Sequence, residues 1–177
     1  MDGPAKQLYD AFCNEDYDEV NELINRHGGF NKVVNEYGWT AIHLAARNGQ
    51  VPILQKIWKM FKPDIDQKNN NGDIPLHDAS HYGILPSVMW LVGHGSDPQT
   101  INNQENTAKD MAKIRNMTGV VEFLDKVDAM KELFPVKEVS PLNIFSLGNY
   151  AEELEEYLAN VETDDPEVIN YVCFMLL

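Results

Sequence analysis

The sequence predicts an all-α solenoid built from stacked helix-turn-helix pairs that are joined by short hairpin-like loops. One observation is an internal repeat, because residues 38–46 (GWTAIHLAA) match residues 72–80 (GDIPLHDAS) at an offset of 34 positions. A second observation is the glycine that follows each copy, with a proline three residues further on, in residues 49–52 and 83–86. A period of this length is typical of repeat solenoids, because a single helix pair cannot bury its apolar stripe alone.

The second repeat shows how each helix pair is built. Ile42, Leu44 and Ala45 place an apolar stripe on a short first helix. Gly49 permits a tight turn, and Pro52 suits the first turn of the next helix, where its missing N–H costs nothing. The second helix is predicted to be amphipathic, because its apolar residues recur at i, i+3 and i+4 spacing: Ile53, Leu54, Ile57, Trp58 and Phe61.

Two further copies complete a set of four repeats. The copy at residues 106–112 follows at an offset of 33, and a weaker copy places Ala11 in register with the repeat alanine. The predicted boundaries are about 3–36, 37–70, 71–104 and 105–134. Polar loops at residues 66–72 and 100–105 connect the helix pairs, since Asn and Gly tolerate left-handed backbone. Because Glu105 replaces the expected glycine, the last hairpin is predicted to be irregular.

Residues 40–43 (TAIH) and 74–77 (IPLH) resemble the T-P-L-H core of the ankyrin repeat. The resemblance implies an ankyrin-repeat solenoid whose hairpins protrude beside a concave face. It also implies that His43 and His77 are buried and hydrogen-bond within and between repeats, with no metal or acid–base role. In the fourth repeat, residues 109–110 (Lys-Asp) replace Leu-His, a departure typical of a terminal repeat that faces solvent.

Residues 135–177 are predicted to form a helical C-terminal extension beyond the repeats of residues 1–134. A helix from Val120 to Phe134 is expected to end at Pro135, and three more helical segments follow it. A degenerate fifth repeat and a family-specific helical cap both fit this extension. The apolar end of the sequence fits either packing on the preceding helices or continuation into a longer chain.

The charge balance narrows the class of partner, and the cysteine content indicates the cellular compartment. Lys and Arg total 14 against 28 Asp and Glu, for a formal net charge of −14. Such a surface repels phosphate backbones and anionic headgroups, so the expected partner is another protein with a basic or mixed surface, not nucleic acid or a membrane. Solubility alone also accounts for the charge. Cys13 and Cys173 are expected to be small buried residues of a reducing compartment, the cytoplasm or nucleus.

The sequence lacks the motifs of catalysis. No nucleophile elbow, Walker segment or dinucleotide fingerprint is present. His81 and His94 lie 13 residues apart, which is not a metal-ligand spacing, and no motif activates Cys13 at the position equivalent to Arg47. We therefore expect a non-catalytic chain, monomeric on its own, that uses no metal or cofactor. Trp58 and Trp90 are predicted packing residues, and the acidic run at 152–165 is a solvated helix face or a dock for a basic segment.

The ankyrin resemblance implies that a partner protein binds to the hairpin tips and to the inner face of the first helices. Trp39, near Tyr37, is expected at an exposed hairpin tip, where it fits a binding hot spot, or else covers the neighbouring hairpin. The implied partner-binding positions are Glu36, Tyr37, Trp39, Arg47, Asn48, Asn70, Asn71, Asp73, His81, Tyr82, Gln104, Asn106 and Arg115, with Ile114 beside them. Two alternatives stay open: a regulatory or inhibitory subunit of an enzyme, and the N-terminal module of a larger enzyme or channel.

Overall fold

The computed structural model describes residues 3–27 and 35–133, and within these ranges the chain is helical with connecting loops. By its internal contacts the chain divides into two compact units, Met1–Ala129 and Met130–Leu177, and α1 to α7 lie in the first. The C-terminal segments predicted beyond residue 134 lie outside the described residues. The described helices are α1 (Pro4–Cys13), α2 (Tyr17–His27), α3 (Ala41–Arg47), α4 (Val51–Phe61), α5 (Pro75–His81), α6 (Leu85–Gly93), α7 (Ala108–Ile114) and α8 (Thr118–Leu133).

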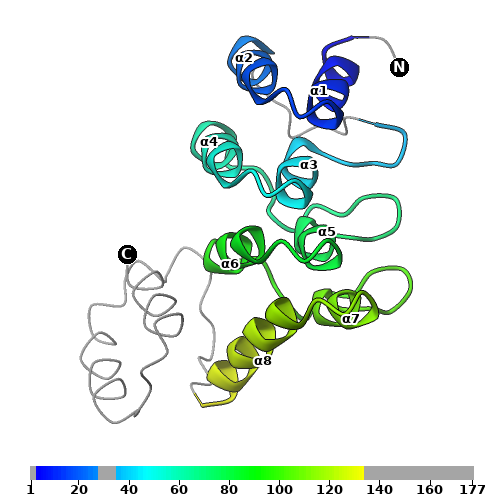
Figure 1. Ribbon diagram of the computed structural model, residues 1–177, viewed down its shortest axis with the longest axis vertical. Helices are drawn as coiled ribbons and strands as arrows, with labels where there is room; N and C mark the ends of the chain where they lie inside the picture. The colour runs from blue at the N-terminus through cyan, green and yellow to red at the C-terminus, as the bar shows by residue number, and fades with distance from the viewer. Residues whose placement is uncertain (1–2, 28–34, 134–177) are drawn as a thin grey trace, which may run out of the picture. The chain divides into compact units, whose positions relative to one another are not determined.

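The helices form two layers in which each odd-numbered helix is paired with the even-numbered helix that follows it (Figure 1). Contacts link α1 to α3, α3 to α5 and α5 to α7, so the first helices stack in chain order. The long loops before α3, α5 and α7 extend to the far side of the first-helix layer (Figure 1). The predicted all-α solenoid of stacked helix pairs is therefore confirmed.

The core lies between the two layers and between successive repeats. Every residue of α3 from Ala41 to Ala46 is buried, because this short helix is covered by a neighbour on each side. In α4 the buried residues are Ile53, Leu54 and Ile57, at the spacing that the sequence predicts. Full burial of such a side chain stabilises a fold by about 1.5–3 kcal/mol. The stripes that define each helix thus supply the packing that holds one repeat on the next.

Tight turns join the two helices of each pair and end in left-handed backbone. Gly49 and Gly83 have φ values of 72° and 71° in the second and third repeats. Glu15 and Asn116 adopt φ values of 57° and 58° at the corresponding turns of the first and fourth repeats. The same turn is therefore present in all four described pairs, although only the middle two use glycine.

The prediction of an irregular last hairpin is wrong. Glu105 has a φ of 61° and takes over the conformation of glycine, and the Asn102 N–H donates to the Asn106 carbonyl at 3.0 Å. Gly72, in the preceding hairpin, has no room for a side chain, because an added Cβ would lie 2.8 Å from the backbone N of Asn103. No described hairpin follows that of Glu105, so a side chain is tolerated there.

Two further expectations need correction. Cys13 was expected to be buried, but it is a free and exposed thiol at the last position of α1. The last described helix begins at Thr118, two residues before the predicted start at Val120. Its start lies directly after the left-handed Asn116, which ends the turn between α7 and α8. Cys173 lies outside the described residues.

Candidate partner-binding surface

Each hairpin before a first helix is organised by a buried asparagine. The Asn69 carboxamide oxygen accepts hydrogen bonds from the N–H groups of Asn71 (2.8 Å) and Asp73 (3.0 Å). Asn35 and Asn102 hold the other two hairpins by the same pair of bonds, to the residues two and four positions later. Sequence reasoning missed these asparagines, although their spacing of 34 and 33 residues follows the repeat. They fix the backbone that carries the predicted binding residues.

Successive hairpins are hydrogen-bonded to one another. The Asn70 N–H donates to the Tyr37 carbonyl at 3.0 Å, and the Asn70 side-chain amide donates to the Glu36 carbonyl at 2.8 Å. Asn103 makes the equivalent bonds to the carbonyls of Asn71 and Asn70. The side-chain amide of Asn70 is therefore used to hold two neighbouring hairpins together. Glu36 and Tyr37 take part through backbone atoms only, which leaves their side chains exposed.

The two repeat histidines have the structural role that the ankyrin resemblance implies. His43 Nε2 lies 3.1 Å from the Asp73 carbonyl of the next hairpin, and its Nδ1 accepts from the Thr40 N–H at 3.2 Å. His77 bonds to the Asn106 carbonyl and the Ile74 N–H in the same way. Because a carbonyl only accepts, Nε2 carries the proton. Burial lowers the pKa of His43 to about 4, so the ring is neutral near pH 7.

Trp39 is not at the exposed tip where it was expected. The Trp39 ring is half-buried, and the Arg47 guanidinium carbon lies 4.5 Å from its centroid. The same guanidinium lies 4.5 Å from the centroid of the Tyr82 ring, and it donates to the Tyr82 hydroxyl at 2.9 Å. A cation between two aromatic rings is stabilised by their quadrupoles. Trp39, Arg47 and Tyr82 thus form a cluster of contacts that joins the hairpin before α3 to the C-terminal ends of α3 and α5.

Tyr37 occupies the exposed position instead. Its side chain is 58% exposed, and its ring lies 6.3 Å from that of Trp39, tilted by 47°. Tyr82 is 41% exposed despite its contact with Arg47. The aromatic surface therefore continues from the hairpin tip onto the end of α5.

Asp73, another predicted partner-binding residue, is buried and bonded inside the protein. Only 8% of it is exposed, and its carboxylate accepts from the Asn102 side-chain amide at 2.7 Å. Its position after Gly72 matches that of Trp39 after Gly38, but the next hairpin covers it. Asn106, the third residue at this position, is half-buried, and its carbonyl accepts from His77. Asp73 and Asn106 therefore bond within the protein at this hairpin position and expose little surface to a partner.

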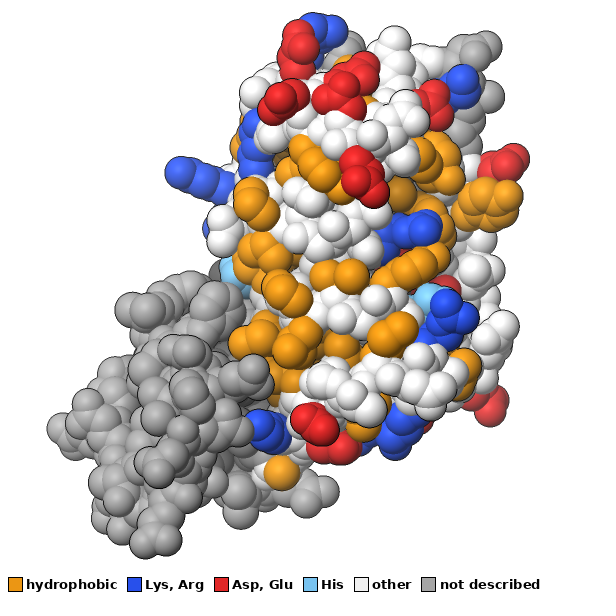
Figure 2. Space-filling view, viewed as in Figure 1, with side chains coloured by type: hydrophobic (Ala, Val, Ile, Leu, Met, Phe, Trp, Pro, Cys, Tyr) orange, Lys and Arg blue, Asp and Glu red, His pale blue; other side chains and the backbone are white. Residues whose placement is uncertain are grey.

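The remaining predicted residues are on the accessible side of the first helices and hairpins. We call this side the inner face, meaning the hairpin tips together with the C-terminal ends of α3, α5 and α7. Asn71, Gln104, Ile114 and Arg115 are exposed, whereas Asn48 and His81 are half-buried. Figure 2 shows apolar side chains as a band across the middle of the stack, while most visible acidic side chains lie toward its first and fourth repeats. The inner face thus carries the aromatic side chains of Tyr37, Trp39 and Tyr82 beside polar and charged ones.

Asp78 is a buried carboxyl residue in the middle of α5 that sequence reasoning missed. It precedes His81 and Tyr82 by three and four positions on α5, so the three side chains share one helix face. Asp78 is 8% exposed, and no protein donor lies within hydrogen-bond distance of its Oδ2. Burial, together with the neighbouring Asp73 carboxylate, raises the pKa of Asp78 to about 7. A signal was available, because the repeat offset of 34 places Asp78 where the second repeat has Leu44.

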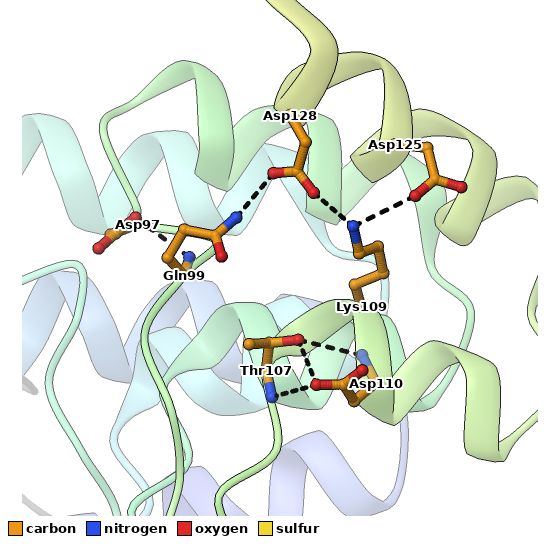
Figure 3. Close-up of polar contacts among 7 residues, drawn as sticks. All are labelled: Asp97, Gln99, Thr107, Lys109, Asp110, Asp125 and Asp128. Atoms are coloured by element: carbon orange, nitrogen blue, oxygen red, sulfur yellow. Dashed lines mark hydrogen bonds and ion pairs between the residues drawn. The ribbon is translucent and has the colours of Figure 1, made fainter. Parts of the chain in front are cut away.

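The fourth repeat replaces the histidine bond by a local cap and an ion-pair cluster (Figure 3). The Asp110 carboxylate accepts from the Thr107 N–H at 3.0 Å and from the Thr107 hydroxyl at 2.7 Å, and these bonds lower the pKa of Asp110. Lys109 pairs with Asp125 at 3.2 Å and with Asp128 on α8. Lys109 therefore fastens α7 to α8, while Thr107 and Asp110 cap the start of α7.

Two further properties bear on function. Within residues 3–27 and 35–133, no group of three or more His, Cys, Asp or Glu side chains is placed to hold a metal ion. None of the described helices is long and apolar enough to cross a bilayer.

Comparison with known proteins agrees with this architecture. The family described as ankyrin repeats (3 copies) matches residues 8–102, more than half of the chain. Mouse protein phosphatase 1 regulatory subunit 12A is 31% identical over 130 residues, which cover 73% of this chain and 11% of that protein. Human ankyrin repeat domain-containing protein 37 is 25% identical over 122 residues, covering 68% of this chain and 76% of that protein. Ankyrin repeat protein nuc-2 of Neurospora crassa is 26% identical over 133 residues, covering 75% and 12%. With the stacked helix pairs and the histidine bonds between them, the match establishes that the chain belongs to the ankyrin-repeat family.

Proposed function

We propose that this chain is a non-catalytic protein-interaction module that binds a partner protein through its inner face. The observation that carries the proposal is the cluster of Trp39, Arg47 and Tyr82, continued by the exposed Tyr37 at the hairpin tip. Tyr, Trp and Arg are the side chains that dominate binding energy at protein interfaces. The ankyrin family, whose repeats serve as protein-interaction modules, supports the same function.

The rigidity of this surface supports tight binding. Three hairpins are held by asparagine bonds within each loop and by further bonds from each loop to the next. Arg47 has little freedom left to lose, because its guanidinium is already held between two rings. Since immobilising a long side chain on binding costs about 0.5–1.5 kcal/mol, a preformed cluster retains more of its contact energy.

The test compares three forms of the protein as baits in a cell extract, with bound proteins quantified by mass spectrometry. The forms are the wild type, the double variant Trp39→Ala/Tyr82→Ala, and the control Met60→Ala, which removes an exposed apolar side chain from α4 in the second-helix layer. We expect one protein to bind the wild type and the control at equal levels and to lose at least 90% of its recovery with the double variant, about a tenfold change in affinity. Equal recovery by all three forms would refute the inner face as the site.

A second function is favoured by one comparison. The likeness to mouse protein phosphatase 1 regulatory subunit 12A supports a regulatory subunit that binds an enzyme. The aligned segment is only 11% of that protein, so the rest of its length has no counterpart in the alignment. Recovery of a phosphatase or other enzyme in stoichiometric amount, with altered activity in the complex, would support this function over simple scaffolding.

The proposed setting is the cytoplasm or nucleus, with the chain monomeric until its partner binds. The free and exposed thiol of Cys13 fits a reducing compartment, where such groups persist. Size-exclusion chromatography with light scattering would test the monomer, and a mass twice that of one 20.1 kDa chain would contradict it.

A further inference from the structure

The net charge of −14 is spread unevenly along the chain. Nine of the 28 acidic residues, but only one of the 14 basic residues, lie in residues 135–177. The first repeat, residues 3–36, has seven acidic and three basic residues, whereas the second and third repeats, residues 37–104, have five of each. At physiological ionic strength, exposed charges further apart than about 8 Å are largely screened from one another. The charges of the middle repeats themselves therefore decide which partner segment fits the inner face.

The acidic residues on the hairpin and first helix of the third repeat are buried. Asp73 and Asp78 are each 8% exposed, so neither carboxyl group is available to a partner. Asp73 also accepts from the Asn102 side-chain amide, while burial and the Asp73 carboxylate raise the pKa of Asp78 to about 7. Glu36 and Glu105 are exposed, but they belong to the hairpins. The C-terminal ends of α3, α5 and α7 thus expose no carboxylate.

Arginine side chains stand at these helix ends instead. Arg47 is the last residue of α3, and Arg115 directly follows α7. Burial lowers the pKa of His81 at the end of α5, and the positive charges of Arg115 and Arg47 lower it further. The two arginine charges therefore both reach the end of α5, although Asp73 acts on His81 in the opposite direction. Figure 2 shows basic and histidine side chains on the right of the middle of the stack, with most visible acidic side chains above and below them.

These side chains have hydrogen-bond donors left for a partner. Arg115 is exposed, and its guanidinium forms no hydrogen bond or ion pair with another described residue. A guanidinium group has several N–H donors, and Arg47 uses one of them within the described residues, in its bond to the Tyr82 hydroxyl. Because that hydroxyl accepts from Arg47, its own proton is available to a second acceptor. Carboxylates are strong acceptors for such groups, since arginine binds them through two parallel hydrogen bonds.

We propose that the inner face binds an extended acidic segment of the partner protein, with one carboxylate on Arg47 and Tyr82 and a second on Arg115. The inference rests on the proposed function, because it names the chemistry of the segment that the inner face binds. Packed helices lie about 8–10 Å apart, so the ends of α3 and α7, with α5 packed between them, are about 16–20 Å apart. An extended chain spans about 3.3–3.6 Å per residue, which places the two acidic residues about five or six positions apart.

The test uses a phage-displayed library of random twelve-residue peptides, selected on the wild-type protein. The affinity of each selected peptide is measured by fluorescence anisotropy on the wild type, Arg115→Gln, Arg115→Lys, Trp39→Ala/Tyr82→Ala and Lys59→Gln. The last variant is the matched control, because it removes the same charge from an exposed position on α4. In each peptide, every Asp is replaced in turn by Asn and every Glu by Gln. Circular dichroism checks that each variant is folded.

We expect the selected peptides to share two acidic residues about five or six positions apart. Neutralising the one that contacts Arg115 should weaken binding to the wild type and to Lys59→Gln at least tenfold, but to Arg115→Gln less than twofold, which is the coupling of two residues in contact. Arg115→Lys should recover most of the affinity that Arg115→Gln loses, because it restores the charge.

Two outcomes would contradict the inference in different ways. Peptides that need Trp39 and Tyr82, but require no acidic residue or show no coupling to Arg115, would overturn the acidic segment and leave the proposed function in place. Peptides that bind the Trp39/Tyr82 variant as tightly as the wild type, or a selection that yields no binder, would count against both.

Discussion

Replacing Asp78 by asparagine, which has nearly the same shape and no charge, should stabilise the fold at pH 8 and change little at pH 4. Burial and the Asp73 carboxylate raise the pKa of Asp78 from 3.8 to about 7, while Arg47 acts in the opposite direction. In the folded protein the carboxyl group therefore keeps its proton at pH values where the unfolded chain has lost it. The contribution of Asp78 to the free energy of unfolding must then fall as the pH rises from about 4 to about 7.

The magnitude follows from that pKa change. A rise from 3.8 to about 7 lowers the free energy of unfolding at pH 8 by about 4 kcal/mol relative to an acid that is not perturbed. Asparagine recovers only part of this, because its amide also needs hydrogen-bond partners when buried. We expect Asp78→Asn to raise the free energy of unfolding by about 2–4 kcal/mol at pH 8.

His43 opposes Asp78 over nearly the same pH range. Burial lowers the pKa of His43 from 6.5 to about 4, so the unfolded chain binds a proton that the folded chain does not. That difference makes the fold more stable as the pH rises from about 4 to about 6.5, by about 3 kcal/mol. The two residues largely cancel in the wild type. Removing the Asp78 charge should therefore reveal a clear loss of stability in acid.

The assay is urea-induced unfolding followed by far-UV circular dichroism at pH 4, 6 and 8. Asp78→Leu is measured beside Asp78→Asn, and Asp18→Asn on α2 serves as an exposed control that should change the free energy of unfolding by less than about 0.5 kcal/mol. The difference between Asp78→Asn and wild type should grow steadily from pH 4 to pH 8. A difference that is the same at pH 4 and pH 8 would refute the claim that a buried, ionising carboxyl group is its source.

Two other predictions concern the hairpins and the last helix pair. Gly72→Ala should lower the free energy of unfolding by about 1–3 kcal/mol, because the residue has a φ of 75° and its Cβ would press on the next hairpin. Glu105→Gly should change the free energy of unfolding by less than about 1 kcal/mol. Chemical denaturation of both variants checks this, and equal effects would contradict the account of hairpin stacking. Lys109→Met should cost about 1 kcal/mol by removing the ion pairs to α8, with a smaller loss in 1 M salt, as thermal unfolding at two ionic strengths would show. A loss that does not depend on salt would point to packing of the lysine stem instead.

Most of the fold could be predicted because repeat spacing and apolar periodicity are local properties of the sequence. Gly49 and Pro52 mark the turn and the start of α4, and the histidines follow a motif whose bonding depends on backbone geometry alone. The hairpin of Glu105 was harder to predict, because Glu105 adopts the left-handed conformation of glycine there and no described hairpin stacks on it. That condition depends on the neighbouring repeat and not on the loop itself.

The candidate site was less predictable for the same reason. The state of Trp39 depends on Arg47 and Tyr82, which come from two different helices, so its position in the repeat does not reveal the contact. Asp73 is equivalent to Trp39 by position, yet it is covered because Asn102 in the next hairpin bonds to it. Comparison of the repeats indicates Asp78, because this polar residue stands where the second repeat has the apolar Leu44. Its repeat position is an apolar core position in the second repeat, so the variable positions of the family do not indicate it.

Different side chains hold the hairpin backbone in place and face a partner. This separation explains how the surface can be specific for one partner and still have a fixed backbone. Asparagine and histidine side chains fix each hairpin by bonding to backbone atoms, so the hairpin geometry does not depend on which residues occupy its tip. Tyr37 contributes only its backbone N–H and carbonyl to these hydrogen bonds, and its side chain is exposed. Asp78 differs, because it takes the place of a core residue and lowers the stability of the repeat that carries it.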